Sequence, residues 1–109
     1  MKIKLSPVFK DTTPLSAQVA GDVITINGEV YDFSPLKEGE TLPSEALPDY
    51  FVGSIERIEG DIHLTLVLPH AVTAPYETRF PAAYSVAMDV VSGEVPLPPY
   101  DEPKAEVLL

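Results

Sequence analysis

Residues 24–33 read ITINGEVYDF, and this stretch is the clearest structural signal in the chain. Asn27 and Gly28 tolerate positive φ angles, which makes the pair typical of a two-residue turn between antiparallel strands. A turn at these residues places Ile24 opposite Tyr31. Because side chains alternate along a strand, one face of this hairpin is predicted to enter a core through Ile24, Ile26, Tyr31 and Phe33.

Short alternating segments recur along the rest of the sequence. Residues 62–68 alternate most strictly, with an apolar residue at every second position. In residues 50–59 the apolar residues are three apart, which fits a strand only with a bulge near Gly53 and Ser54. Further strands are expected at residues 2–6, 16–20, 77–80 and 82–91, and one helical turn is expected at residues 41–48.

These segments predict an all-β protein. Antiparallel hairpins at close spacing are expected to form a small sandwich or barrel, with at most one short helical turn. Twelve prolines among 109 residues argue against long helices. A single domain is expected at residues 1–91. Residues 92–109 contain four prolines and interspersed acids, so they are expected to form an extended acidic tail.

The chain is strongly acidic, with 17 Asp and Glu residues against seven Lys and Arg and a net charge of −10. Such a chain repels phosphate backbones and anionic lipid, so neither nucleic acid nor a membrane is expected as a partner. The charge favours solubility, and a basic protein partner is the alternative. The sequence contains no cysteine, which excludes thiolate chemistry and suits a reducing cytoplasm.

The titratable residues form no recognisable catalytic or metal-binding pattern. His63 and His70 match no common ligand spacing, although Glu56 or Glu59 is a candidate partner for His63 across a hairpin. The acids of the two hairpins invite a carboxylate or calcium interpretation, but no calcium-loop motif is present. These acids are Asp22, Glu29, Asp32, Glu56, Glu59 and Asp61. No catalytic, cofactor-binding or metal-binding residue is therefore predicted, and no enzymatic activity is expected.

The predicted tail has two features that suit binding. Residues 96–100 fit a P-x-x-P pattern, which is typical of polyproline II segments that dock in aromatic grooves. The chain also ends in apolar residues, which suit contact with the sheet edge of a neighbouring subunit in a homo-oligomer. A solvated linker and a frayed end are the alternatives. The candidate interaction residues are Pro96, Pro98, Pro99, Tyr100, Leu108 and Leu109.

The sequence resembles a set of small uncharacterised proteins encoded by tailed bacteriophages and prophages. The resemblance covers roughly the first hundred residues, and it is carried by residues 21–22, 26–29, 32–36, 64–66 and 68–70. It implies a phage context near tail genes and no catalytic residue. It also implies a location in the cytoplasm of a bacterial host, or in the virion.

Three functional hypotheses follow. The first is a non-enzymatic accessory or structural component that contacts a phage structural or tail protein. The second is a small carbohydrate- or metal-ion-binding β-module, in which exposed tyrosines stack on the ligand and acids supply polar contacts. The tyrosines are Tyr31, Tyr50, Tyr76, Tyr84 and Tyr100. The third is a small hydrolase, which requires a carboxyl group with a raised pKa.

Overall fold

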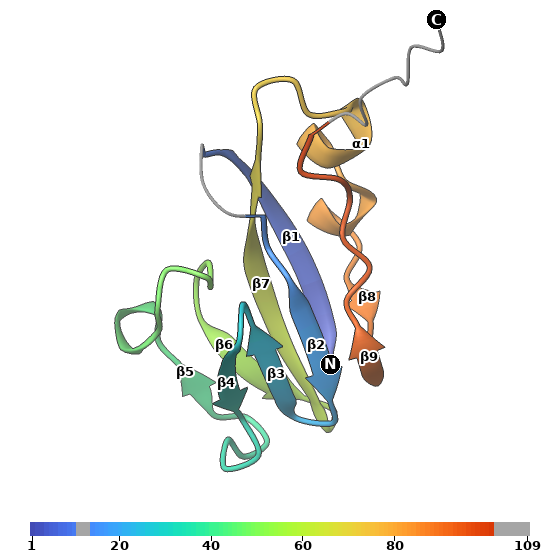
Figure 1. Ribbon diagram of the computed structural model, residues 1–109. Coiled ribbons are helices and arrows are strands. Elements are labelled where there is room, and N and C mark those ends of the chain that lie inside the picture. Colours follow the sequence, from blue (N-terminus) through green and yellow to red (C-terminus); the bar gives the residue numbers. More distant parts are fainter. Residues whose placement is uncertain (11–13, 102–109) are drawn as a thin grey trace, which may run out of the picture.

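The structure is a computed structural model that describes residues 1–10 and 14–101, and its strands form two sheets (Figure 1). The strands are β1 (Lys2–Phe9), β2 (Ala17–Ala20), β3 (Val23–Ile26), β4 (Glu29–Asp32), β5 (Thr41–Leu42), β6 (Ile55–Ile58), β7 (Asp61–His70), β8 (Met88–Asp89) and β9 (Ser92–Glu94). Sheet A has the order β5-β6-β7-β1-β8, and sheet B has the order β4-β3-β2-β9. Within the described residues no barrel closes, so the predicted all-β class is confirmed in its sandwich form.

Three short helical segments interrupt the strands of the described chain: η1 (Ser44–Ala46), α1 (Tyr76–Arg79) and η2 (Ala82–Tyr84). The helical turn predicted at residues 41–48 is confirmed by η1, which begins after Pro43. The expectation of at most one such turn was wrong, because α1 and η2 occupy sequence that was predicted to be strand.

The first hairpin forms in the predicted register. Asn27 has φ 48° and Gly28 has φ 86°, as a two-residue turn of this kind requires. Ile24 pairs with Tyr31, and the backbone N–H of Phe33 donates to the carbonyl of Asp22 at 2.9 Å. The face predicted to enter the core does so at Ile24, Ile26 and Phe33, which are buried, whereas Tyr31 is half-buried and packs against the edge of the core.

The second hairpin, β6–β7, contains the predicted bulge. Glu56 pairs with His63 next to the turn, whereas further along the hairpin Phe51 pairs with Leu66. Residues 52–54 therefore lie opposite Thr65 alone, and the chain absorbs the extra length where Gly53 has φ 71°. The alternate residues of β7 are buried as expected, and this strand continues beyond its predicted end to His70.

Strand β1 pairs with β7 in parallel, which the prediction of antiparallel hairpins did not include. Eight residue pairs join the two strands, among them Ile3 with Leu64 and Leu5 with Leu66. Parallel neighbours need a long crossover connection. Here β2, β3 and β4 of sheet B, together with β5 and β6, lie between them in sequence.

One apolar core lies between the sheets. Its fully buried large apolar side chains are Ile3, Leu5, Ile55, Ile62 and Leu66 from sheet A, and Ile24 and Ile26 from sheet B. Burying a side chain of this size contributes about 1.5–3 kcal/mol relative to exposure.

Arg57 on β6 joins the two sheets near the hairpin turns. Its Nη2 donates to Asp22 Oδ2 at 2.9 Å and to the carbonyl of Phe33 at 3.2 Å, and its Nε donates to the carbonyl of Leu36. The hydrogen bond and the negative charge of Asp22 raise the pKa of Arg57. The side chain of Glu38 accepts hydrogen bonds from the backbone N–H groups of Glu59 and Gly60 in the β6–β7 turn. These bonds hold the loop that contains Glu38 against this turn.

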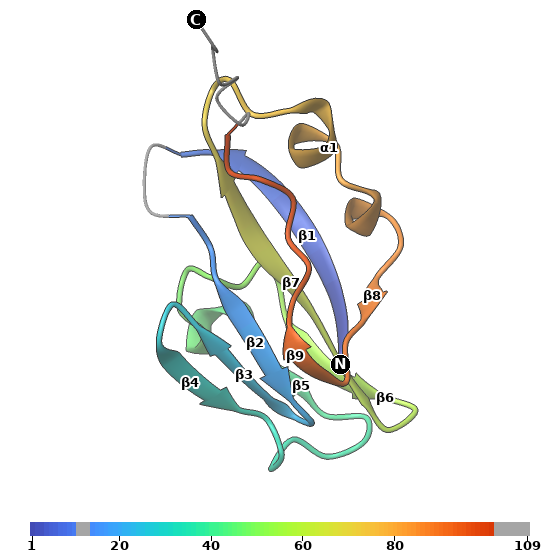
Figure 2. The same cartoon turned by 45° about the vertical axis from the view of Figure 1, so that its right-hand side comes forward.

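The segment predicted to be a separate tail packs along the body as far as the structure describes it. Strand β9 pairs with β2, and Val95 is buried. From there residues 95–101, here called the strap, run along the molecule from β9 to α1 (Figures 1 and 2). The predicted boundary at residue 91 is therefore too early, because β9 and Val95 complete sheet B and the core.

Candidate interaction surface

The helical turn α1 directs two aromatic side chains outward. It begins after Pro75, whose φ of −64° suits the start of a helix and whose carbonyl accepts hydrogen bonds from the next turn. Thr78 points inward and is fully buried, whereas Tyr76 is 70% and Phe80 61% exposed. The short edge strand predicted at residues 77–80 is therefore wrong, since the proline starts a helical turn there.

The turn η2 resembles α1, because it also follows a proline, buries one residue and leaves an aromatic side chain exposed. It begins after Pro81, and it buries Ala83 while Tyr84 remains 63% exposed. The strand predicted at residues 82–91 is reduced to β8, which pairs with the start of β1. The alternation of apolar residues here matched a strand, but Tyr84 and Val86 remain exposed in the structure.

Together these residues form what we call the aromatic surface: Pro7, Tyr76, Arg79, Phe80, Pro81 and Tyr84. The rings of Tyr76 and Phe80 lie with their centres 4.9 Å apart, and the guanidinium carbon of Arg79 lies 5.9 Å from the Phe80 ring centre. A groove of about 520 Å³ runs between Pro7 and Tyr84, and it is lined mainly by apolar side chains.

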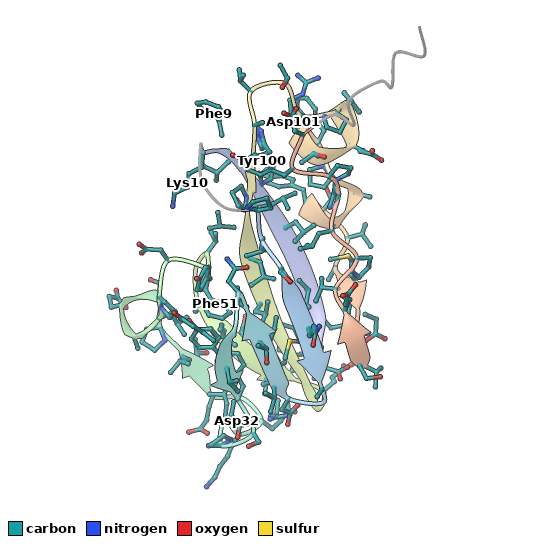
Figure 3. The ribbon with its side chains drawn as sticks, viewed as in Figure 1. Phe9, Lys10, Asp32, Phe51, Tyr100 and Asp101 are labelled. Atoms are coloured by element: carbon teal, nitrogen blue, oxygen red, sulfur yellow. The ribbon has the colours of Figure 1, made fainter. Side chains whose placement is uncertain are left out.

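Exposed apolar side chains gather at this end of the molecule. Of the eleven large hydrophobic residues that are exposed in the described chain, seven come from residues 8–9 and 72–86. Over residues 62–88 the only acidic or basic side chains besides histidine are Glu77 and Arg79. This stretch therefore adds little net charge to an acidic protein, and exposed apolar surfaces mark interaction sites. In Figure 3, Phe9, Lys10, Tyr100 and Asp101 lie at this end, whereas Asp32 lies at the other.

The strap is anchored beside α1. The hydroxyl of Thr78 donates to the carbonyl of Pro99 at 2.6 Å, and the N–H of Ala71 donates to the carbonyl of Tyr100 at 2.8 Å. The Tyr100 hydroxyl donates to the carbonyl of Lys10 at 2.9 Å. Tyr100 therefore has intramolecular partners and is only partly exposed.

The other predicted interaction residues are divided by the structure. Pro96 and Pro98 line an apolar groove beside Val86 and Met88. Pro99 is exposed, although its carbonyl is held by α1. Leu108 and Leu109 lie outside the described residues.

The two histidines are far apart on β7. They are seven positions apart along the strand, which corresponds to about 23 Å and places their side chains on opposite faces of the sheet. His70 is buried, with Nδ1 2.9 Å from the carbonyl oxygen of Ala71. His63 lies on the outer face directly opposite Glu56, one of its two predicted partners. The histidines therefore cannot bind one metal ion together.

On its other side His63 is paired in register with Lys2, which pairs in turn with Asp89. Lys2 Nζ lies 2.9 Å from Asp89 Oδ2. This hydrogen bond raises the pKa of Lys2 and lowers the pKa of Asp89, since each stabilises the charge of the other. This row of side chains on the outer face of sheet A, from Glu56 through His63 and Lys2 to Asp89, is thus polar and suited to solvent.

The acids of the first hairpin have structural partners. Asp22 pairs with Arg57, and Glu29 accepts a hydrogen bond from a neighbouring tyrosine hydroxyl. Asp32 accepts a hydrogen bond from the backbone N–H of Ser34 at 2.9 Å, which lowers the pKa of Asp32. Among residues 1–10 and 14–101 no group of three His, Cys, Asp or Glu side chains is arranged to hold a metal ion.

Two of the tyrosines considered as stacking residues are half-buried. Tyr31 and Tyr50 lie edge-on to each other at 6.3 Å, and Tyr31 also lies edge-on to Phe51 at 5.3 Å. Burial, followed by the hydrogen bond to Glu29, raises the pKa of Tyr31 to about 12. Tyr76 and Tyr84 are the exposed tyrosines of the set, and both belong to the aromatic surface rather than to the hairpins.

A second hollow, of about 540 Å³, lies where the two sheets separate near Lys10. Its other lining residues are Leu15, Asn27, Asp49, Tyr50, Val67 and Pro69. The Asn27 side-chain oxygen already accepts a hydrogen bond from the N–H of Ser16 at 2.8 Å. Lys10 and Asp49 are the charged residues of this hollow, so it has no pair of carboxylates of the kind that glycosidases use.

Comparison of the chain with models of known protein families, with curated proteins and with solved structures gives no match. Among residues 1–10 and 14–101 no helix is long and apolar enough to cross a membrane.

Proposed function

We propose that the protein is a non-enzymatic interaction component of a tailed phage or prophage, and that it contacts other proteins through the aromatic surface. The observation that carries the proposal is the exposure of Tyr76, Phe80 and Tyr84 around an apolar groove. Aromatic residues are enriched at protein interfaces, and they often supply most of the binding energy there. The resemblance to tail-associated phage proteins supplies the biological context.

The chemistry of the remaining polar groups supports the same proposal. A hydrolase built on paired carboxylates needs one acid whose pKa is raised. Asp32 and Asp89 instead have lowered pKa values, because hydrogen bonds stabilise their charged forms. Asp22 is committed to Arg57 across the two sheets. These acids maintain the fold and the solvation of the protein.

The proposal is tested in bacteria that produce the phage from a prophage carrying this gene. The tagged chain is expected to co-purify with tail proteins, and Phe80→Asp is expected to reduce their recovery at least tenfold. Val30→Asp is the matched control, because Val30 is equally exposed (66%) but lies on β4, away from the aromatic surface. Equal recovery with both variants, or no recovery with the unmodified chain, would contradict the proposal.

A further inference from the structure

We infer that the aromatic surface binds the same surface of a second copy of this chain, around a two-fold axis that runs along α1. The inference rests on the proposed function, since it names the partner for the surface proposed there. It is carried by the arrangement of four residues around Thr78: Tyr76, Glu77, Arg79 and Phe80.

The burial of Thr78 fixes the orientation of α1. Successive residues of a helical turn are about 100° apart around the axis. With Thr78 facing the core, Tyr76 and Phe80 share the outward face, as their ring contact at 4.9 Å shows. Glu77 and Arg79 then lie about 80° to either side of this aromatic stripe. The turn therefore presents two rings flanked by one negative and one positive side chain.

Such a surface is complementary to itself. In a two-fold interface each residue i that contacts residue j has an equivalent contact of j with i. When the axis runs along the aromatic stripe, the rings of the two copies meet and Glu77 of each copy faces Arg79 of the other. An axis across the stripe would instead place like charges together. The charges of Glu77 and Arg79 therefore favour the dimer whose axis runs along the aromatic stripe over the dimer whose axis crosses it.

The charge distribution of the whole chain favours contact at this end. Two copies that each carry a net charge of −10 repel each other wherever their acidic surfaces approach. Residues 62–88 contribute only Glu77 and Arg79, apart from histidine, so this region adds no net charge at neutral pH. A second copy therefore meets no net charge from α1 itself, and it buries exposed apolar surface when it approaches here.

The oligomeric state of the purified full chain is the first test. Light scattering after size exclusion, run from low to high micromolar concentration, should give a mass that rises toward twice the 11.8 kDa of one chain. Phe80→Asp should weaken dimerisation at least tenfold, whereas Val30→Asp adds the same charge elsewhere and should leave it unchanged. A monomeric unmodified chain at every concentration would overturn the inference.

Exchanging the charges of Glu77 and Arg79 tests whether the two-fold axis runs along α1. Glu77→Arg places two cations opposite each other and should weaken dimerisation about tenfold, and Arg79→Glu should do the same with two anions. The double variant Glu77→Arg/Arg79→Glu should restore the original affinity. Glu45→Arg on the exposed η1 controls for the change in net charge. Single variants that dimerise like the unmodified chain, or a double variant that stays weak while circular dichroism shows it folded, would overturn the arrangement.

Cross-linking gives an independent readout, because the chain contains no cysteine. Phe80→Cys lies on the stripe and should form a disulfide with its own counterpart under mild oxidation, whereas Val30→Cys should not. If the chain is monomeric but Phe80→Asp still abolishes recovery of tail proteins, the second copy is the wrong partner and the proposed function stands. If neither association depends on Phe80, both proposals fail.

Discussion

The hydroxyl of Thr78 is expected to hold the strap on the body of the protein, and Thr78→Val tests this. Thr78 is fully buried, and its Oγ1 donates to the carbonyl of Pro99 at 2.6 Å. Valine has nearly the same shape, so the change removes the donor without opening a cavity. The carbonyl of Pro99 loses this partner, although Pro99 is itself exposed and water can replace part of the bond.

The expected cost is therefore near the lower end of the range for a lost buried hydrogen bond, about 1–2 kcal/mol. For a domain of about this size each kcal/mol lowers Tm by roughly 4–8 °C. Urea unfolding followed by circular dichroism measures the change, and the m value should stay constant because the folded state remains compact.

Hydrogen exchange identifies where the stability is lost. The N–H of Ala71 donates to the carbonyl of Tyr100, so its protection reports whether the strap is closed. Thr78→Val should release this amide more than it releases the amides of β7, since opening of the strap is local. Thr78→Ser keeps the hydroxyl and is the control. A Thr78→Val variant with unchanged stability and unchanged Ala71 exchange would refute the assignment.

Three further changes probe other parts of the fold. Gly28→Ala should destabilise the protein by about 1–2 kcal/mol in urea unfolding, because φ at this turn is 86° and alanine is strained there. Ile62→Ala should cost about 2–5 kcal/mol by the same measurement, because it leaves a cavity in a fully buried position. The raised pKa of Tyr31, about 12 against 10.0 in the unfolded chain, stabilises the fold below pH 10, and this contribution is lost as pH rises through 12. Tyr31→Phe should therefore lessen the loss of stability between about pH 10 and 12 in alkaline unfolding curves.

The sequence predicted the structural features that depend on neighbouring residues. The turn at Asn27 and Gly28 needs positive φ at both positions, and the alternation on either side specifies the same register, so two local signals agree. The bulge after Phe51 was likewise visible, because apolar residues three apart cannot all face the core of a regular strand. The parallel pairing of β1 with β7 has no such signal, since residues 10–60 lie between these strands.

The errors near the aromatic surface have a common physical cause. Tyrosine and valine favour strands mainly because they pack well on a pleated, half-buried surface. Residues 82–86 have the composition of a strand, but Ala83 is buried while Tyr84 and Val86 remain exposed, and the prolines before both turns set φ near the helical value. The strap was missed for a related reason. Val95 and Leu97 are two residues apart and both pack on the core, but the prolines around them suggested a solvated tail.

The distribution of acids also explains why association should avoid the edges of the sheets. Strand β4 lies at an edge of sheet B, and Val30 at its centre is 66% exposed. An exposed edge can recruit a second strand, and charged side chains beside it are a common defence. Glu29 and Asp32 bracket Val30, so two copies that paired along β4 would bring four carboxylates together. On α1 the acidic Glu77 is instead balanced by the basic Arg79. The same net charge that keeps the edges apart therefore directs contact toward the aromatic surface.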